Sequence, residues 1–542
     1  MLMAELSDGP NSEKGRVMQL SRFFIASALV CASLFAVAWQ GVVVPGVSDI
    51  VSAHSPQDSG LDSELRAQLA AAGFTGDIEK EFKRRLKNSL GRPLDNKLAD
   101  LGRLLWFDQL HSLGRDNTCG GCHSPANGMG DSQPMAIGVQ SNGIVGPSRT
   151  GPRNQRRSPA VVNTALFPRL MWNNRFEALS GDPFDGSNGF SFPAPEGDER
   201  FSAAENRLHD VQHLLQAQAH IPPTELIEVG AFEGVCPGGV PEPGIDSRLC
   251  QFDVDGPGLP VPLPDSSGFR NEPIRQVALA ALNANAEYRK RFGQVFKEVK
   301  RGAPIDFFMF GKAIAEFEFT LVFADAPLDR FARGHQNAMT THEKRGAVLF
   351  FGKAGCVSCH RVDGNSNEMF SDFREHVLGV PQVFPQFGVN TGNFIFSGPS
   401  ENEDFGREER SGDPADRYKF RTSPLRNLAV QAGFFHNGAY VDLDDAVRFH
   451  LSVVSSAASY DPDAAGIPAD LRQVGPVIPA SLVDERVRTA IALSESEVTD
   501  LVQFLRTGLL DDRALSSHLC KLIPASVPSG LPVLTFEGCP AP

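Results

Sequence analysis

Basic residues are in the minority in this sequence of 542 residues. It contains 51 lysines and arginines against 65 aspartates and glutamates, which gives a net charge of −14. An acidic surface repels phosphate groups, so the composition argues against nucleic acid as a partner. Alternation of apolar and polar residues, the pattern typical of half-buried strands, is also scarce. The predicted fold class is therefore mainly α.

The N-terminal segment has the order of charged and apolar residues typical of an export signal. Basic residues within 14–22 precede an apolar run over 23–39, which closes with Ala36, Val37 and Ala38. Small residues at this place suit a signal peptidase. An uncleaved membrane anchor is the alternative, because a run of roughly 17 residues just suffices to span a bilayer. Both interpretations place the rest of the chain outside the cytoplasm, and we expect a periplasmic protein.

Four of the nine cysteines lie in two CxxCH motifs, Cys119-Gly-Gly-Cys122-His123 and Cys356-Val-Ser-Cys359-His360. In a c-type cytochrome the two thiols of such a motif bond to the haem vinyl groups, and the histidine becomes the proximal ligand of the iron. A zinc site would need further Cys or His residues at short spacing, and neither motif has them. The sequence therefore predicts two covalently bound haem c groups.

Four cysteines remain outside the motifs and the signal segment. Cys236 and Cys250 form one local pair, and Cys520 and Cys539 form a second. In an oxidising compartment each pair could close a short loop by a disulfide, and four free thiols are the alternative.

Helical periodicity surrounds both motifs and suggests a loose duplication with one haem in each copy. The expected helices are at 61–90, 95–106, 270–301, 306–323, 338–351, 442–451 and 494–505. We expect a signal or anchor and linker over 1–60, followed by two cytochrome-c-like haem domains. The N-terminal domain spans 61–335, with insertions at about 181–270, the C-terminal domain spans 336–515, and 516–542 forms a tail. Glycine- and proline-rich loops connect these parts, most clearly over 128–159.

Short segments accompany the two motifs in a fixed order. They are LGRLLWFD (101–108), SPAVVN (158–163), MWNNR (171–175), RGAVLFF (345–351), SPLRN (423–427) and FFHNGA (434–439). In this order they resemble the bacterial di-haem cytochrome c peroxidases and their MauG-type relatives. The resemblance implies that the haem on His123 is the peroxidatic one and that the haem on His360 receives electrons. It also implies that Trp172 lies between the haems and couples them.

The resemblance further implies a distal pocket at the first haem. Gln218, Pro222 and Glu225 match its pattern, although Gln218 and Glu225 are closer together than the family pattern expects, and Glu225 would move a proton between the peroxide oxygens. In many relatives a histidine that follows an Ile-Gly pair caps this iron, whereas here Ile137-Gly138 is followed by Val139. Since valine cannot bind iron, we expect an open first haem. Four histidines are candidate replacements, although each suits a surface or structural role: His111, His209, His213 and His220.

The sixth ligand of the second haem is expected fourteen residues after the histidine of the FFHNGA segment. This position is His450, and we predict a His360/His450 pair, with Met369 as the alternative ligand. Many relatives also hold calcium between the domains with an Asn side chain and a Thr-x-Pro segment. Thr422 and Pro424 match, but Arg157 stands at the Asn position, and a cation there opposes calcium.

The predicted function is reduction of hydrogen peroxide by a periplasmic di-haem peroxidase. Its electrons would come from a soluble donor such as cytochrome c or a cupredoxin, and a homodimer is possible. Two alternatives remain. One is a MauG-like oxidase or oxygenase that acts on an organic or protein substrate, and the other is an electron-transfer cytochrome without catalysis.

Overall fold

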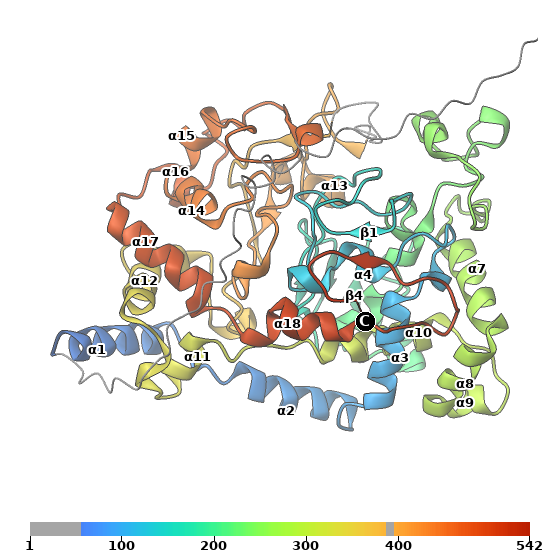
Figure 1. Ribbon diagram of the computed structural model, residues 1–542, viewed down its shortest axis with the longest axis horizontal. Helices are drawn as coiled ribbons and strands as arrows, with labels where there is room; N and C mark the ends of the chain where they lie inside the picture. Colours follow the sequence, from blue (N-terminus) through green and yellow to red (C-terminus); the bar gives the residue numbers. More distant parts are fainter. Residues whose placement is uncertain (1–55, 386–394, 542) are drawn as a thin grey trace, which may run out of the picture. The chain divides into compact units, whose positions relative to one another are not determined.

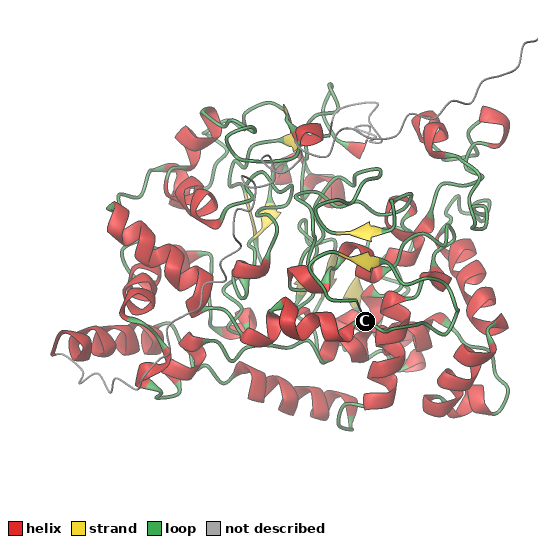
Figure 2. Ribbon diagram, in the orientation of Figure 1, coloured by secondary structure: helices red, strands yellow, loops and turns green. Residues whose placement is uncertain are grey.

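Helices and long loops make up most of the computed structural model, which describes residues 56–385 and 395–541. The predicted signal or anchor segment lies outside this range. The strands are few and only two or three residues long (Figure 2). The mainly α expectation is therefore confirmed. Within the described ranges no helix is both long and apolar enough to cross a membrane.

The α-helices are numbered in chain order in Figure 1. They are α1 (Pro56–Ala71), α2 (Ile78–Leu90), α3 (Asn96–Phe107), α4 (Cys119–Cys122), α5 (Ala203–His209), α6 (Leu214–Gln218), α7 (Asn271–Ala284), α8 (Ala286–Val295), α9 (Lys297–Lys300), α10 (Phe307–Phe319), α11 (Pro327–Ala332), α12 (Thr341–Phe351), α13 (Glu408–Ser411), α14 (Leu443–Leu451), α15 (Val453–Ala458), α16 (Glu485–Arg488), α17 (Glu495–Gln503) and α18 (Ser516–Leu519).

The strands form four small sheets. An antiparallel sheet contains β2 (Arg169–Leu170), β3 (Phe176–Ala178) and β4 (Phe190–Ser191). Two antiparallel pairs join β5 (Glu375–His376) with β7 (Phe420–Arg421) and β6 (Val383–Phe384) with β8 (Gln473–Val474). The fourth pair is parallel and joins β1 (Ile144–Val145) with β9 (Thr535–Phe536).

Capping side chains fix the start of the helices that the periodicity predicts. Asp95, Asp306, Asp442 and Ser494 each accept a backbone N–H of the first turn, at α3, α10, α14 and α17. Such caps satisfy amide groups that have no partner inside the helix. The predicted starts at 95, 306, 442 and 494 are therefore confirmed.

The single helix expected over 61–90 is wrong, because the chain forms α1 and α2 with a turn between them. Gly73 and Gly76 both have positive φ in this turn, and a Cβ on Gly76 would collide with the backbone of Asp329. Glu368 holds the turn from outside by accepting the N–H and hydroxyl of Thr75 at 2.6 and 2.7 Å. A partner nearly 300 residues away thus overrides the helical periodicity.

Each CxxCH motif follows a helix that packs closely on a partner through a glycine. In α3, a Cβ on Gly102 would collide with the carbonyl of Ala313 in α10. In α12, a Cβ on Gly346 would collide with the carbonyl of Asp500 in α17. Glycine allows this close approach of two backbones. Both motifs therefore follow a helix that packs on a partner helix through a glycine. This similarity agrees with the duplication seen in the sequence.

The C-terminal tail packs against the first motif. Besides the β1–β9 pairing, Phe536 stacks edge-on against Phe107 with ring centres 5.6 Å apart and lies over Gly120. Cys520 and Cys539 form a disulfide within the tail, and Cys236 and Cys250 form the other predicted disulfide. The described residues form one compact unit. The division into haem domains at 335/336 stays a prediction.

Candidate functional site

The second CxxCH motif begins one residue after Gly355, which ends the turn that follows α12. Gly355 has a positive φ of 66°, and the His360 N–H donates to the carbonyl of Cys356 at 2.9 Å. The Nδ1 of His360 lies 2.9 Å from the carbonyl of Phe370. A hydrogen bond from Nδ1 fixes the ring and leaves Nε2 free to bind a metal. Burial lowers the pKa of His360 to about 4, so the ring is neutral, as a metal ligand must be.

His450 faces this imidazole from α14. Its Nδ1 lies 2.9 Å from the carbonyl of Ala446, one turn earlier, and burial lowers its pKa. The ring centres of His360 and His450 are 6.3 Å apart. A metal–nitrogen bond of roughly 2 Å, with roughly 1.1 Å from nitrogen to ring centre, gives about 6 Å across one metal ion. The two histidines therefore fit the axial ligands of a single iron.

A cavity of about 490 Å³ surrounds this pair. Cys356, Cys359, His360 and His450 all line it, and both thiols are free. Most of the other lining residues are apolar, which suits a flat macrocycle with two polar substituents. The residues present thus fit a haem. Met369, the alternative ligand, also lines the cavity and is fully buried.

The first CxxCH motif forms the short helix α4. The Thr118 hydroxyl before it donates to the carbonyl of Trp106 at 2.7 Å, which joins the motif to the end of α3. A Cβ on Gly121 would come within 1.9 Å of the Oδ1 of Asn117, so a larger residue here would displace the Asn117 side chain. Burial lowers the pKa of His123 to about 4 and raises that of the Cys122 thiol to about 11. A neutral imidazole and two free thiols therefore meet at this motif too.

The segment of Val139 lies beside the first motif, because the Sγ of Cys122 is 3.5 Å from the carbonyl of Ile137, and Val139 offers no ligand atom. It is fully buried, and its N–H donates to the carbonyl of Ile227 at 3.2 Å. A Cβ on Gly138 would collide with the carbonyl of Ile227 and come within 3.0 Å of the Cα of Glu228. The Ile-Gly-Val segment is thus packed against residues 227 and 228 by close backbone contact.

The histidines considered as replacement ligands have different surroundings. The Nε2 of His213 lies 3.0 Å from the carbonyl of Ala165, and the Nδ1 of His220 lies 3.1 Å from that of Gln216. His209 stacks on the ring of Phe308 at 3.8 Å. These contacts suit the structural roles that the sequence favours. His111 is buried, and neither ring nitrogen has a hydrogen-bond partner among the described residues.

Arg175 of the MWNNR segment lies between the predicted distal carboxylate, Glu225, and a second carboxylate, Glu228. Its Nη1 lies 3.4 Å from Glu225, and its Nη2 lies 3.7 Å from Glu228. Gln218 is at the C-terminal end of α6, and Pro222 opens the turn before Glu225. The structure therefore brings Glu225 close to the segment of Trp172, and with it a carboxylate that the sequence reasoning missed.

Glu228 has the closer connection to the first motif. The side-chain amide of Asn117 donates to the backbone carbonyl of Glu228 at 2.6 Å. The same amide nitrogen lies 3.8 Å from the Sγ of Cys122. The pKa of the Glu228 carboxyl is raised to about 7, first by burial and then by the negative charge of Glu225. Glu225 is closer to Gln218 than the family pattern expects. That short spacing is the sequence signal that points further along the chain, to Glu228.

Trp172 is clamped by backbone hydrogen bonds in the wall of the second cavity. Its indole N–H donates to the carbonyl of Arg157 at 2.8 Å, and its own carbonyl accepts the N–H of Arg421 at 2.7 Å. Trp172 is 8% exposed. Both ends of the residue are therefore fixed.

The residues at the expected calcium site do not fit that ion. Thr422 and Pro424 line the second cavity, and the carbonyl of Thr422 already accepts the hydroxyl of Ser371 at 2.7 Å. Arg157, at the position of the expected Asn ligand, is a buried cation. Calcium prefers carboxylate and carbonyl oxygens, so a guanidinium group opposes it.

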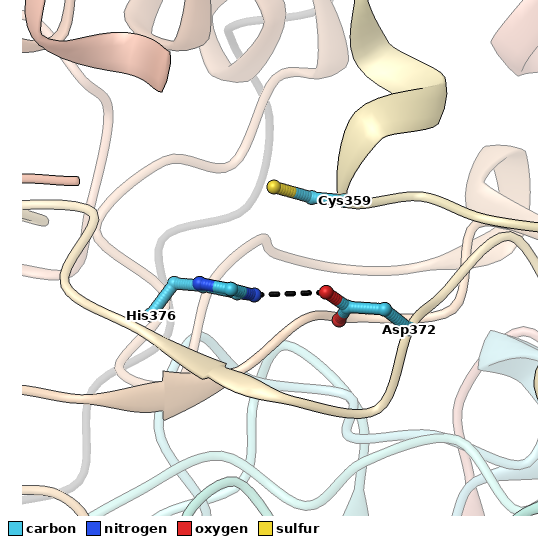
Figure 3. A group of neighbouring side chains, drawn as sticks. All are labelled: Cys359, Asp372 and His376. Atoms are coloured by element: carbon cyan, nitrogen blue, oxygen red, sulfur yellow. Dashed lines mark hydrogen bonds and ion pairs between the residues drawn. The ribbon is translucent and has the colours of Figure 1, made fainter. Parts of the chain in front are cut away.

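Cys359, Asp372 and His376 form a further cluster beside the second motif (Figure 3). The Nε2 of His376 lies 2.9 Å from Asp372, and its Nδ1 lies 3.0 Å from Asp484. Both ring nitrogens are thus engaged. Since the Cys359 thiol belongs to the CxxCH motif, the cluster is part of the second site and not a separate metal centre.

Comparison with known proteins finds similarity to one family. Residues 96–337 match the model of the di-haem cytochrome c peroxidase family. The chain is 26% identical over 364 residues to a cytochrome-c peroxidase, IdrP2, of Denitromonas iodatirespirans, which covers 65% of this chain and 73% of that protein. It is 27% identical over 433 residues to the methylamine utilization protein MauG of Paracoccus denitrificans, with 78% and 90% covered.

Among solved structures, a MauG-like protein associated with microbial copper homeostasis aligns with a TM-score of 0.49 and 21% identity. The alignment covers 78% of this chain and 91% of that one. The family match and the curated relatives agree with the ordered motifs of the sequence. Residues 96–337 therefore match the di-haem cytochrome c peroxidase family, and the chain is similar over most of its length to oxidoreductases of the cytochrome-c peroxidase and MauG type.

Proposed function

We propose that this chain is a periplasmic di-haem peroxidase that reduces hydrogen peroxide to water with electrons from a small soluble donor. Cys119, Cys122 and His123 would hold the first haem. Cys356, Cys359 and His360 would hold the second, with His450 as its other axial ligand. When bound, the haems supply the redox chemistry, in which one peroxide takes up two electrons and two protons to give two waters.

The contrast between the two sites carries the proposal. His360 and His450 are spaced to hold one iron between them, so both would serve as ligands when a haem is bound at the second site. At the first, the position that often carries a capping histidine is Val139. A site with both axial positions filled transfers electrons, whereas a site with a free position can bind peroxide. This difference supports electron uptake at the second site and peroxide reduction at the first.

Glu228 is the better candidate for the acid/base group, in place of Glu225. Proton transfer is most effective when the pKa of the group lies near the working pH. The raised pKa of Glu228, about 7, meets this condition. Its carboxylate could accept the proton of one peroxide oxygen and return it to the other. Glu225 and Arg175 would then act on Glu228 through their charges.

Trp172 is the proposed route between the sites. Its clamped indole lies in the wall of the second cavity, and Arg175, three residues later, reaches the carboxylates beside the first motif. A rigid aromatic group in this place would couple the two haems without rearrangement. Gln218 remains a proposed distal-pocket residue.

The proposal is tested by an EPR spectrum of the ferric protein before and after one equivalent of peroxide. We expect a high-spin signal from the first haem together with a low-spin signal from the bis-imidazole second haem. Only the high-spin signal should disappear at first on addition of peroxide. Two low-spin signals that ignore peroxide would contradict the open first site and favour an electron-transfer cytochrome.

A MauG-like oxidase is the second candidate, because a non-Met ligand at the second haem and a missing distal histidine both favour it. The two candidates differ in their reductant. Rapid peroxide turnover with reduced cytochrome c supports the peroxidase. A long-lived oxidised state that does not react with cytochrome c supports the oxidase, which would take its electrons from an organic or protein substrate.

A further inference from the structure

Four arginines line the cavity of the second site, and they fall into two kinds. Arg426 forms two hydrogen bonds to Asp329, at 2.7 and 2.8 Å, and Arg486 is paired with Asp484 at 2.6 Å. Arg157 and Arg421 have no carboxylate within ion-pair distance among the described residues. In the described part of the chain, these two guanidinium groups therefore have no direct ion pair, and Asp131 and Glu375 act on their charges only from a greater distance.

Both unpaired arginines are buried and have N–H groups to spare. Arg157 is 4% exposed, and its Nε and Nη2 have no partner among the residues described. Arg421 is 5% exposed; its Nη1 donates to the carbonyl of Arg169 at 2.8 Å, but its Nε has no partner. Burial lowers the pKa of each to about 10, so both remain cations at neutral pH.

A buried charge without a partner is strongly unfavourable, and an anion that supplies acceptors removes this cost. Guanidinium groups suit carboxylates best, because their planar N–H donors match the two carboxylate oxygens. Two such groups in one cavity call for two carboxylates. A haem carries two propionates, and the same cavity contains the cysteines and histidines that would bind the macrocycle.

We infer that Arg157 and Arg421 bind the two propionates of the haem held on His360. This inference rests on the proposed function only in requiring a haem in this cavity. The Arg157 carbonyl and the Arg421 N–H are also the groups that clamp Trp172 from either end. The pair would therefore hold the propionate edge of a bound haem beside the indole.

The test uses Arg157→Gln, Arg421→Gln and the double variant of the full-length protein. Arg153→Gln serves as the control, because Arg153 is also 4% exposed but is paired with Asp470 and does not line the cavity. The readouts are the midpoint potential of the low-spin haem and the propionate bending bands in its resonance Raman spectrum. The haem remains attached through its cysteines, so the signals can be followed in every variant.

We expect each cavity variant to shift the propionate bands and to lower the midpoint potential, with the larger shift in the double variant. A nearby positive charge favours the reduced haem, so its loss must lower the potential. The propionates should also bind protons more readily, which makes the potential pH-dependent near neutrality. Arg153→Gln should leave the bands of the low-spin haem unchanged.

If a glutamine variant does not fold, Arg157→Lys and Arg421→Lys provide the second test. Lysine keeps the charge but loses the planar pair of donors, so the potential should change little while the Raman bands move. Unchanged bands and potential in variants that retain both haems would overturn the inference. A wild-type protein without a low-spin bis-imidazole haem would contradict the proposed function instead.

Discussion

At the residue scale, the two neighbouring carboxylates of the distal segment differ in what surrounds them. The backbone carbonyl of Glu228 is tied through Asn117 to the first CxxCH motif, whereas the carboxylate of Glu225 lies against Arg175 at 3.4 Å. The sequence pattern alone selects Glu225, because it contains no information on burial. The closely packed backbone at Gly138 and the raised pKa of Glu228 come from contacts between separate loops.

Replacement of Glu228 by glutamine should therefore reduce the peroxidase turnover number by roughly 10²–10⁴-fold, the usual contribution of a general acid or base. Glu225→Gln should cost much less. It should also move the acidic limb of the pH profile to lower pH, because removal of its negative charge lowers the pKa of Glu228. Steady-state kinetics over pH would show both effects. A larger loss in Glu225→Gln than in Glu228→Gln would restore Glu225 as the acid/base residue.

At the element scale, helix α14 shows how much the sequence predicts. Asp442 caps its start, and the apolar spacing places His450 on the same face as Ala446, one turn earlier. Caps and periodicity are local, so the predicted starts of α3, α10, α14 and α17 are confirmed. The break between α1 and α2 depends on Glu368 and Asp329, which are far away in sequence, and no local pattern announces it.

Substitution of His450 in α14 tests the axial pair. His450→Met should keep the second haem low-spin and raise its midpoint potential by the order of 0.1 V, since axial ligands tune haem potentials over roughly 0.8 V. His450→Ala should convert this haem to a high-spin form. EPR and redox titration would measure both. A low-spin spectrum that persists in His450→Ala would identify another ligand, with Met369 the first to be examined.

At the scale of the whole molecule, the tail joins parts that are more than 400 residues apart. The Asp108 carboxylate accepts the N–H of Ser529 at 3.1 Å and the hydroxyl of Tyr288 at 2.7 Å. The side chain of Gln109 donates to the carbonyl of Pro532 at 2.7 Å. None of these pairings leaves a pattern in the sequence, where the tail reads only as irregular.

Removal of the Cys520–Cys539 disulfide by two serine substitutions should lower the free energy of unfolding by about 3 kcal/mol, as for other loops of similar length. It should also alter the spectrum of the first haem, because the tail covers Gly120. The matched control is the double serine variant of Cys236 and Cys250, whose disulfide closes a loop of similar length in another part of the sequence. Urea unfolding and visible spectra would separate the two effects. Equal spectral changes in both variants would contradict a specific role of the tail.

Each end of the described chain packs near the CxxCH motif that is farther from it in sequence. Helix α1 packs against α12, which leads to the second motif, while the tail packs beside the first (Figure 1). A protease that cuts between Ala332 and Thr341 would therefore produce two fragments. The N-terminal fragment would contact the C-terminal one through α1, and the C-terminal fragment would contact the N-terminal one through the tail. Such a nicked protein would keep its halves together through these crossed contacts, and the fragments would separate only when both unfold.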